Sequence, residues 1–496
     1  MDIKDKIQNL VKDSLGKLHI DFSSVEIVVD IPKDIVNGHY STNVSMRLSS
    51  RLKDSPMSIA NKIVGSISND IDIDRVETAS PGFINFFLSN RYFMKEISQI
   101  IDRGEDGLYL PTKKDQSILV EFTDANPFKV LHIGHLYSNS VGESFARLQE
   151  ALGAKVIRAC YQGDIGLHVA KSIWGLEKKL SCEKRKLQDL ERLPLTERVA
   201  YLGDSYALGS SHYDDIKDEE SIEEINDLNY YIFSLFSETI EKKDLSKFEE
   251  DNIKEKYTKG RQWCLDYFET IYAKLGTKFD NYFFESEVGE RGLQIVDENM
   301  GKVFEKDDGA IIYKGDPKRG LHTRVFVNSQ GIPTYEAKEI GLALLKHDEF
   351  EYDESIVVTA NEQTGYFKVV LDAFSKIYPD IAKSIKHMPH GTVKLPGMKK
   401  MSSRKGEILS AAWLIDETKR RVLEVMTEKD DELAEKIAVA AIKYAYLKVA
   451  VGRDIAFDID QAISFDGDTG SYLLYVYARC NSILNEVKEN GVVSES

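Results

Sequence analysis

Cysteines and long apolar runs are scarce in this sequence. Its 496 residues include four cysteines, Cys160, Cys182, Cys264 and Cys480, and none of them forms a C-x-x-C pair. This scatter argues against a structural zinc site and favours a reducing compartment. No apolar stretch approaches the length of a membrane span, and the N-terminal MDIKDKIQNL is charged throughout, unlike a signal peptide. A cytoplasmic protein that does not bind membranes is therefore predicted.

Positive charge is also in short supply. The chain holds 65 Lys and Arg against 82 Asp and Glu, which gives a formal net charge of −17. A general nucleic-acid binder would be basic overall, so this class is disfavoured, although an RNA bound on local basic surface is not. The 42 % hydrophobic and 30 % charged content is typical of a globular protein, and the length suggests about three domains.

One stretch, Ser117–Gly166, has the pattern of a strand, a loop, a helix and a second strand. Ile118–Phe122 and Val156–Cys160 are short apolar runs typical of buried strands. Leu136–Leu152 carries apolar residues at helical spacing, and Gly153 stands where a C-terminal glycine is expected. From Ser117 to about residue 406 strand and helix patterns alternate, which predicts a doubly wound parallel sheet.

The loop between the first strand and the helix contains His132-Ile133-Gly134-His135. A loop entering a helix N-terminus offers free backbone N–H groups and the positive end of the helix dipole, which suit an anion. Gly134 lets a ligand approach the backbone closely, and two imidazoles can donate to phosphate oxygens. An arbitrary tetrapeptide of this kind is more often two satisfied surface histidines, but the flanking strand and helix favour a phosphate site.

A second element, Thr392–Gly406, reverses the acidic character of the chain locally. Its sequence, TVKLPGMKKMSSRKG, contains five basic residues and no acidic one. The glycines and the proline predict a loop rather than a helix. Lysines and serine hydroxyls in a loop suit a leaving pyrophosphate, whereas the plainer alternatives are a solvated basic loop or a generic nucleic-acid patch.

These two elements resemble the signature motifs of class I aminoacyl-tRNA synthetases, in the same order along the chain. The surroundings resemble arginyl-tRNA synthetases in particular. The similar blocks, which span nearly the whole chain, are EFTDANPFKVLHIGHL, GDIG (Gly163–Gly166), TYEAKE (Thr334–Glu339), ANEQTGYF (Ala360–Phe367) and SFDGDTGSYLLYVYAR (Ser464–Arg479). The resemblance implies an arginine–tRNA ligase that activates L-arginine with ATP and transfers it to the terminal adenosine of tRNA(Arg), acting as a monomer.

The same resemblance gives an expected domain organisation. Residues 1–105 form a small α/β domain that binds the tRNA D-loop, in which Val25–Ile31 reads as a strand. Residues 106–406 form the Rossmann-like catalytic domain, which a helical insertion at about 182–259 interrupts. Residues 407–496 are all-helical and resemble the start of an anticodon-binding bundle. The family continues for roughly another domain half, so the alternatives are a truncated chain and a naturally short protein.

The resemblance also assigns site residues. In the N-terminal domain Phe83 and Asn85 match an aromatic and an amide that contact a D-loop base, although Phe83 is equally compatible with a core position. The residues implied for ATP are His132, Gly134, His135, Lys400, Met401, Ser402 and Ser403. Of these, His132, His135 and Lys400 are implied as catalytic, and Ser403 replaces the second lysine of the general motif. Mg²⁺ is expected on the nucleotide substrate, with no metal site built by the protein.

An arginine pocket needs carboxylates and amides in fork geometry around a planar guanidinium. The residues that match the family's substrate contacts are Glu121, Asp124, Asn126, Tyr335, Glu339 and Gln363. Most relatives carry Asp where this chain has Glu339, which changes the reach of the side chain but keeps its charge. The alternative for Glu339 and Asp124 is an exposed surface carboxylate.

Three rival functions remain open from the sequence. A synthetase for another amino acid and a nucleotidyltransferase would share the phosphate chemistry. A non-catalytic RNA-binding paralogue should have lost His132, His135 or Lys400, and all three are present. Glu121 and Glu339 favour a cationic substrate over a neutral one.

Overall fold

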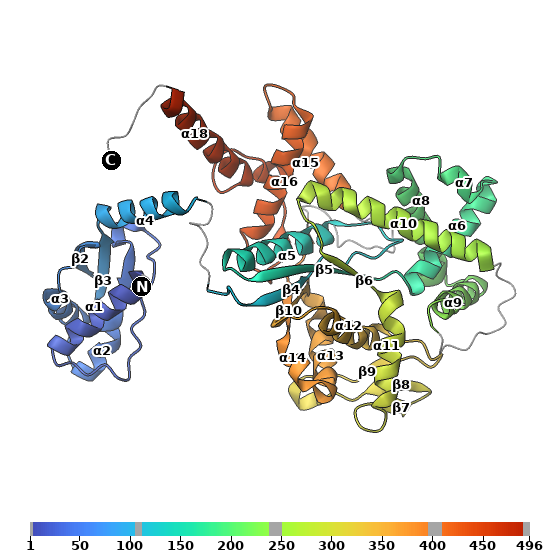
Figure 1. Cartoon of the computed structure of the whole chain (residues 1–496), viewed down its shortest axis with the longest axis horizontal. Helices are drawn as coiled ribbons and strands as arrows, with labels where there is room; N and C mark the ends of the chain where they lie inside the picture. Colours follow the sequence, from blue (N-terminus) through green and yellow to red (C-terminus); the bar gives the residue numbers. More distant parts are fainter. Residues whose placement is uncertain (1–2, 105–111, 238–249, 395–408, 490–496) are drawn as a thin grey trace. The chain divides into compact units, whose positions relative to one another are not determined.

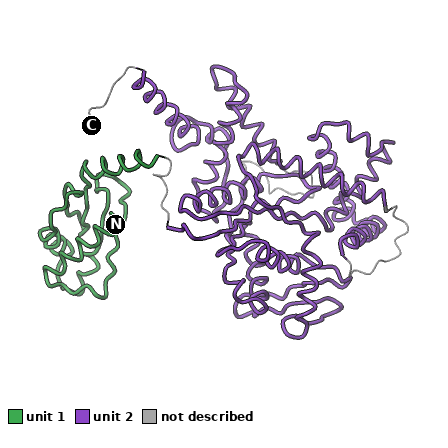
Figure 2. The backbone as a smooth tube through the Cα atoms, viewed as in Figure 1, with its two compact units in different colours: residues 1–110 green, residues 111–496 purple. Residues whose placement is uncertain are grey.

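The computed structural model describes residues 3–104, 112–237, 250–394 and 409–489. The chain divides into two compact units, residues 1–110 and 111–496 (Figure 2). The predicted domain boundary at residue 105 lies in the stretch 105–111, outside the described residues. None of the described helices is long and apolar enough to cross a membrane.

Unit 1 is a three-stranded antiparallel sheet packed against helices. Its strand order is β1-β3-β2. The elements are α1 (Ile3–Lys17), β1 (Tyr40–Thr42), α2 (Val44–Leu52), α3 (Pro56–Ser66), β2 (Ile73–Ala79), β3 (Phe83–Leu88) and α4 (Asn90–Arg103), with a 3-10 turn η1 (Ile35–Asn37). The predicted strand Val25–Ile31 was wrong, because this segment makes only a single bridge, between Asp30 and Ser41. Its apolar residues Ile27 and Val29 are nevertheless buried in the core of the unit.

Unit 2 is built on a five-stranded parallel sheet of order β11-β10-β4-β5-β6 (Figure 1). The strands are β4 (Ser117–Glu121), β5 (Lys155–Gln162), β6 (Asn281–Phe284), β10 (Glu354–Ala360) and β11 (Ile385–His390). Every neighbouring pair is parallel. The predicted parallel α/β fold is therefore confirmed.

The strand order reverses at β4. From β4 the chain passes through α5 (Ile133–Ala151) to β5 on one side, and it returns later to place β10 on the other side. In open α/β sheets ligands bind beyond the carboxyl ends of the strands at such a switch point. The fold therefore places the loop after β4, which carries the two histidines, where a ligand is expected.

Both faces of this sheet are covered, as in other parallel sheets. Ile118 and Val120 of β4 belong to the core that α5 shares, whereas Leu119 packs with the core on the other face. Helix α5 approaches the sheet very closely, because a Cβ at Gly142 would lie 2.2 Å from the Phe122 ring. This close packing holds the middle of α5 against the residue that follows β4.

In the described part of the long connection between β5 and β6, all regular elements are helical. They are α6 (Leu167–Glu183), α7 (Leu187–Leu190), α8 (Leu195–Ser210), the π-helical turn η3 (Ser211–Ile216), α9 (Glu219–Ser234) and α10 (Glu250–Leu275). Residues 238–249 of this region lie outside the described residues. The described helices of this connection run from Leu167 to Leu275, beyond both bounds of the predicted insertion at about 182–259.

The connection from β6 to β11 completes the wall beside the sheet. It contains α11 (Glu285–Glu298), a small antiparallel sheet, α12 (Tyr335–Glu349), a 3-10 turn η5 (Asn361–Gln363), α13 (Thr364–Ile377) and α14 (Pro379–Ser384). The small sheet consists of β7 (Glu305–Asp307), β8 (Ala310–Tyr313) and β9 (Arg324–Val327), with the 3-10 turn η4 (Pro317–Arg319). Figure 1 shows α5 on one side of the parallel sheet and α11, α12 and α13 on the other.

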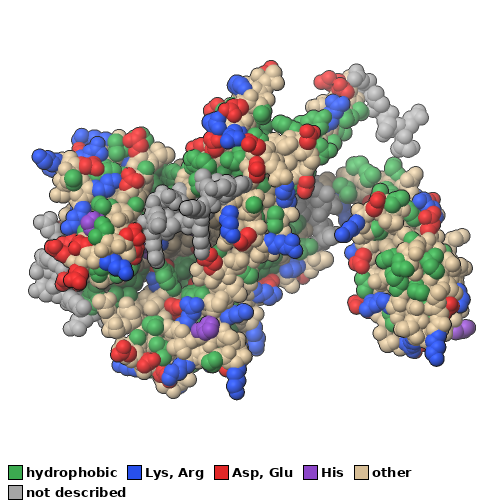
Figure 3. Space-filling view, turned by 180° about the vertical axis from the view of Figure 1, so that it is seen from behind, with side chains coloured by type: hydrophobic (Ala, Val, Ile, Leu, Met, Phe, Trp, Pro, Cys, Tyr) green, Lys and Arg blue, Asp and Glu red, His purple; other side chains and the backbone are tan. Residues whose placement is uncertain are grey.

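The chain after the basic element is mainly helical. It contains α15 (Ala411–Val425), α16 (Asp431–Leu447), α17 (Ile459–Ala462) and α18 (Gly470–Glu489), and the short β12 (Val393–Lys394) pairs with β13 (Ile455–Ala456). Helix α18 is largely exposed, and hydrophobic side chains run along it (Figure 3). The predicted apolar stripe of this helix includes Leu473, 53 % exposed, and Leu484, 55 % exposed.

Candidate active site

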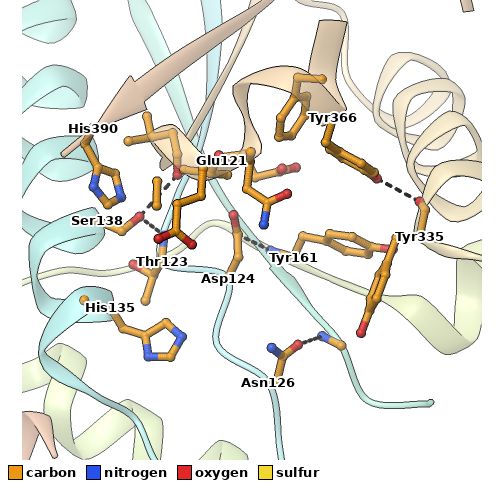
Figure 4. A pocket seen from close by; sticks show the side chains of 18 of the residues that line it. Glu121, Thr123, Asp124, Asn126, His135, Ser138, Tyr161, Tyr335, Tyr366 and His390 are labelled. Atoms are coloured by element: carbon orange, nitrogen blue, oxygen red, sulfur yellow. Dashed lines mark hydrogen bonds between the residues drawn. The ribbon is translucent and has the colours of Figure 1, made fainter. Parts of the chain in front are cut away.

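A cavity of about 660 Å³ opens at the carboxyl ends of the parallel strands (Figure 4). It brings together nine of the residues predicted for ATP or arginine: Glu121, Asp124, Asn126, His132, Gly134, His135, Tyr335, Glu339 and Gln363. The four others, Lys400, Met401, Ser402 and Ser403, lie outside the described residues. Residues up to 242 positions apart (363 − 121) therefore share one cavity.

The two histidines form one part of this cavity. His132 caps α5, and its Nδ1 accepts the Gly134 N–H at 3.1 Å. The N–H of His132 donates to Nδ1 of His135 at 3.1 Å, and the two rings stack with their centroids 3.8 Å apart. Because Nδ1 accepts in each ring, each neutral imidazole carries its proton on Nε2, where it can donate.

The prediction of free N–H groups at this helix terminus was wrong. The N–H of Ile133 donates to the carbonyl oxygen of Leu409 at 3.1 Å, and the N–H of His135 donates to the carbonyl oxygen of His132 at 2.9 Å. The N–H of Gly134 is taken by the His132 ring. The imidazoles themselves cap the helix, so an anion in this part of the cavity meets Nε2–H groups.

Burial keeps these imidazoles neutral. Burial lowers the pKa of His132 to about 4, and the positive charge of Lys129 adds to this effect. Burial and the neighbouring His132 also lower the pKa of His135 well below its usual range. Neutral donors held in place by the backbone can stabilise charge that develops on a phosphate without first reorganising.

Carboxylates form the other part of the cavity. Glu121 ends β4 and is 1 % exposed, and Lys346 of α12 donates from Nζ to its Oε2 at 2.9 Å. Asp124 lies in the loop after β4, and its Oδ1 accepts the backbone N–H of Tyr161 at 2.9 Å (Figure 4). The sequence analysis missed Lys346, because 225 positions separate it from Glu121 and no local pattern links them.

Glu339 reaches the same cavity from α12, one helical turn after Tyr335. Within the described parts of the chain no hydrogen-bond donor is paired with its carboxylate. Burial, reinforced by the negative charge of Glu121, raises the pKa of Glu339 to about 8. The same two causes raise the pKa of Asp124 well above its usual range. The carboxyl of Glu339 therefore keeps its proton at neutral pH, and a bound cation would displace that proton.

Asn126 is held by the segment after β5. Its Oδ1 accepts the N–H of Gly163 at 3.1 Å, and a Cβ at position 163 would lie 2.2 Å from that oxygen. The next residue, Asp164, is fully buried and accepts hydrogen bonds from three side chains, those of Tyr257, Arg261 and Ser286. The GDIG block thereby joins the cavity wall to α10 and α11.

Aromatic residues close the cavity on the side away from His135 (Figure 4). The hydroxyl of Tyr366 donates to the carbonyl oxygen of Tyr335 at 2.9 Å. The ring of Tyr335 is exposed, with 56 % of the residue accessible. Gln363 comes from η5, directly after β10. Both tyrosines therefore belong to the cavity lining contributed by α12 and α13.

Several lining residues were not singled out from the sequence: Thr123, Ser138, Tyr161, Tyr366 and His390. Thr123 and Tyr161 lie at the ends of strands that were predicted, so their positions at the sheet edge were a usable signal. His390 ends β11, whose sequence IKHMPH contains a proline and two histidines and lacks the composition of a buried strand.

A second cavity, of about 310 Å³, lies in unit 1. Phe83 and Asn85, both predicted to contact RNA, line it together with Ser41 and Asn43. Phe83 is 38 % exposed, so it is not a core residue, and the Asn85 Oδ1 accepts the Ser41 hydroxyl at 2.8 Å. The Oδ1 of Asn43 is buried without a partner among the described residues.

The described residues contain no group of three or more His, Cys, Asp or Glu side chains that could hold a metal ion.

Two protein families match the sequence. The family described as "tRNA synthetases class I (R), catalytic domain" matches residues 96–459. The family described as "Arginyl tRNA synthetase N terminal domain" matches residues 5–88. Together they cover both units of the structure, and the first alone covers more than half of the chain.

Individual relatives agree with these families. The arginine–tRNA ligase of Fusobacterium nucleatum is 30 % identical over 477 residues, which cover 94 % of this chain and 78 % of the relative. That of Borrelia hermsii is 27 % identical over 514 residues, covering 100 % of this chain and 82 % of the relative. Among solved structures, Thermus thermophilus arginyl-tRNA synthetase superposes with a TM-score of 0.69 at 20 % identity, covering 98 % of this chain and 82 % of that one. The last comparison shows a shared fold.

Proposed function

The chain belongs to the arginyl-tRNA synthetases of class I, and we propose that it joins arginine to tRNA in the cavity at the ends of β4 and β10. In the first step the arginine carboxylate attacks the α-phosphate of ATP, which yields arginyl-adenylate and pyrophosphate. In the second step the arginyl group passes to the terminal adenosine of tRNA. Neither step needs a protein nucleophile, so positioning and charge stabilisation carry the catalysis.

The histidine part of the cavity receives the phosphates of ATP. The Nε2–H groups of His132 and His135 donate to phosphate oxygens, and Gly134 leaves space for them. A Cβ at position 134 would lie 3.0 Å from the His132 ring, so a side chain there would disturb the stacked pair. Mg²⁺ arrives with ATP as part of the substrate. Lys400, Ser402 and Ser403 are assigned to the β- and γ-phosphates on the sequence motif alone.

The carboxylate part receives the arginine. Glu339 and Asp124 supply negative charge for the cationic groups of the substrate, and Asn126 and Gln363 supply amides. A buried guanidinium needs opposite charge and filled hydrogen bonds, because an unpaired buried charge is costly. Tyr335 covers the substrate from the side of α12. The observation that carries this proposal is the neutral histidine pair beside two carboxyls, those of Asp124 and Glu339, that form no salt bridge with any described lysine or arginine.

Unit 1 contributes a tRNA contact through its own cavity. Unpaired RNA bases are read by stacking on aromatic rings and by hydrogen bonds to their edges. The exposed ring of Phe83 and the amide of Asn85 provide both kinds of contact in one cavity of about 310 Å³. The buried Oδ1 of Asn43, which lacks a described partner, adds an acceptor for a base amino group.

We expect the enzyme to act as a monomer.

Amino-acid-dependent exchange between ATP and pyrophosphate tests this function. We expect exchange with arginine and with no other standard amino acid, and a strong increase when tRNA(Arg) is present, because bound tRNA completes the site in an induced fit. Exchange that depends on a different amino acid would assign the enzyme to another synthetase. The absence of exchange, with and without tRNA, would favour a non-catalytic RNA-binding role.

A further inference from the structure

The lining of the cavity contains six acidic residues, and three of them are paired with a lysine or arginine. Glu121 is paired with Lys346, Glu336 accepts from Arg324 at 3.0 Å, and Glu285 is paired with Lys338. Glu362 is exposed at the rim. The two that remain are Asp124 and Glu339, and no described lysine or arginine forms a salt bridge with either.

The Lys346–Glu121 pair is the most deeply buried of these. The side chains are 1 % and 2 % exposed, and Nζ and Oε2 lie 2.9 Å apart. An ion pair at this depth is a weak source of stability, because desolvation of the two charges offsets their attraction. Removal of the lysine alone would leave an uncompensated carboxylate in the cavity wall. This pair is therefore better explained by its effect on the charge of the cavity than by its effect on folding.

Lys346 lies on the helix that also carries Glu339. Seven residues, or two turns, separate them, so both side chains project from one face of α12 towards the end of β4. The positive charge of Lys346 acts on both remaining carboxyls, and it opposes the rise in the pKa of Glu339 and of Asp124. Burial lowers the pKa of Lys346, but the negative charges of Glu121 and Glu339 outweigh this effect and raise it, so the lysine stays charged.

We propose that Lys346 is a specificity-determining positioning residue of the arginine pocket. By holding Glu121 in a closed pair, it leaves two carboxylates, Asp124 and Glu339, for the two cationic groups of arginine, the guanidinium and the α-ammonium. This inference rests on the proposed function. A neutral isostere such as citrulline has only the α-ammonium and would leave one buried carboxylate without a cation, which is costly.

The proposal predicts a proton balance for substrate binding. Arginine needs Glu339 ionised, so below the pKa of Glu339, about 8, its binding releases a proton and strengthens as pH rises. The groups that face Glu339 are Glu121 of β4, Asp124 of the following loop, Glu285 of α11, the tyrosines Tyr161 and Tyr366, and Lys346 itself. Lys346 is the cation among them that favours the ionised form of Glu339.

Calorimetric titration of the full chain with arginine and with citrulline tests this role. It would be run at pH 7.0 and 9.0, in two buffers of different ionisation enthalpy, so that released protons are counted. We expect Lys346→Met to weaken arginine binding at pH 7.0 about tenfold, the effect of one unit in the pKa of Glu339. At pH 9.0 the loss of arginine affinity in Lys346→Met should be smaller. Arginine binding to this variant should release more protons than binding to the wild type. At pH 7.0 the variant should prefer arginine over citrulline less strongly than the wild type does.

Three further variants separate charge from structure. Lys346→Arg keeps the cation and should keep the wild-type pH profile. The double variant Lys346→Met/Glu121→Gln removes both charges of the pair and should restore the wild-type proton count and affinity. Lys256→Met breaks another buried lysine pair, with Glu177 at 2.7 Å, on α10 far along the chain. It should change the melting temperature without altering the pH profile of arginine binding.

Three outcomes would overturn the proposal. One is a Lys346→Met enzyme whose pH profile and proton count match those of the wild type. Another is a double variant that fails to recover, since this would mean that the substrate uses the charge of Glu121 directly. The third is a Lys346→Met enzyme in which only the melting temperature changes, while arginine affinity and its preference over citrulline stay at the wild-type values. A wild-type chain that does not prefer arginine would instead contradict the proposed function, so the two failures are distinguishable.

Discussion

The histidine part and the carboxylate part of the cavity are both buried, and burial drives them in opposite directions. It lowers the pKa of His132 to about 4 and raises that of Glu339 to about 8. Both groups are therefore neutral near pH 7. The imidazole of His132 is neutral because it has released a proton, and the carboxyl of Glu339 is neutral because it has kept one.

The difference shows which part is ready before the substrate arrives. The imidazoles are fixed through Nδ1 by backbone N–H groups of α5, and their Nε2–H donors exist without any ligand. The carboxyl of Glu339 ionises fully near neutral pH only when a cation replaces its proton. Phosphate binding is thus preorganised by the fold, whereas recognition of arginine is completed by arginine itself.

Removal of a phosphate donor should have the largest effect on activity. We expect His135→Ala, like Lys400→Ala, to cost about 2.7–4 kcal/mol of transition-state stabilisation, roughly 10²–10³ in the rate of arginine activation. Arginine affinity should change little, because the carboxylate part is untouched. Pyrophosphate exchange measures the rate, and calorimetry measures the affinity.

Two substitutions at the same position sharpen this test. His135→Asn can still accept the His132 N–H but has no donor at the place of Nε2, so it should lose as much activity as alanine. His135→Gln places an amide N–H near that point and should recover part of the rate. His347→Ala, an exposed histidine of α12, serves as the control. If the Asn and Gln variants are equally active, the Nε2–H is not the group that acts.

Loss of the charge at Glu339 should have the next largest effect, on selectivity rather than on phosphate chemistry. We expect Glu339→Gln to raise the arginine Kd roughly 10- to 100-fold, the cost of removing the partner of a charged hydrogen bond. The preference over citrulline should narrow in parallel, because the glutamine no longer penalises a neutral side chain. Glu339→Asp should retain the preference. The control is Glu349→Gln, an exposed carboxylate on the same helix.

Competition of citrulline with arginine in the exchange assay measures this selectivity. If the Glu339→Gln enzyme keeps the wild-type arginine Kd and still rejects citrulline, Glu339 does not contribute to arginine recognition.

Local sequence patterns anticipated the framework of this site better than its charges. The strands β4 and β5 and the helix α5 follow from apolar runs and helical spacing, so the carboxyl edge of the sheet could be placed. The irregular segment Val25–Ile31 has the apolar composition of a strand. It buries Ile27 and Val29 without pairing along its length, because tertiary packing overrode its local preference.

Two features of the site were beyond reach of the sequence. The state of the helix terminus depends on which side chains turn back to cap it, and here histidines do what Ser or Asp usually does. The partner of Glu121 depends on a contact across 225 positions, between a strand end and the face of α12. Spacing rules describe neighbours within an element, so they cannot give pairings of this kind.

The smallest predicted effect concerns the free energy of unfolding. The histidine part and the carboxylate part of the cavity should change this free energy in different pH ranges. The pKa of His132 is about 4 in the folded chain against an ordinary value of 6.5, so this histidine lowers stability as pH falls towards 4, and its contribution fades above pH 6.5. The pKa of Glu339 is about 8 in the folded chain against an ordinary value of 4.5, so this carboxyl lowers stability as pH rises from 4.5 to 8. Between pH 6.5 and 8 the carboxylate part therefore contributes more to the pH dependence than the histidine part.

In that window the melting temperature of the free wild-type enzyme should fall by about 1–3 °C more than that of Glu339→Gln, given the usual shift per unit of free energy for chains of this size. Saturating arginine should abolish the excess slope, because the bound guanidinium keeps Glu339 ionised at every pH in the window. Differential scanning calorimetry at pH values of about 6.5, 7.25 and 8.0, with and without arginine, measures both effects. Parallel slopes for the two free enzymes would mean that Glu339 is already ionised in the empty cavity, and the two parts would then be equally preorganised.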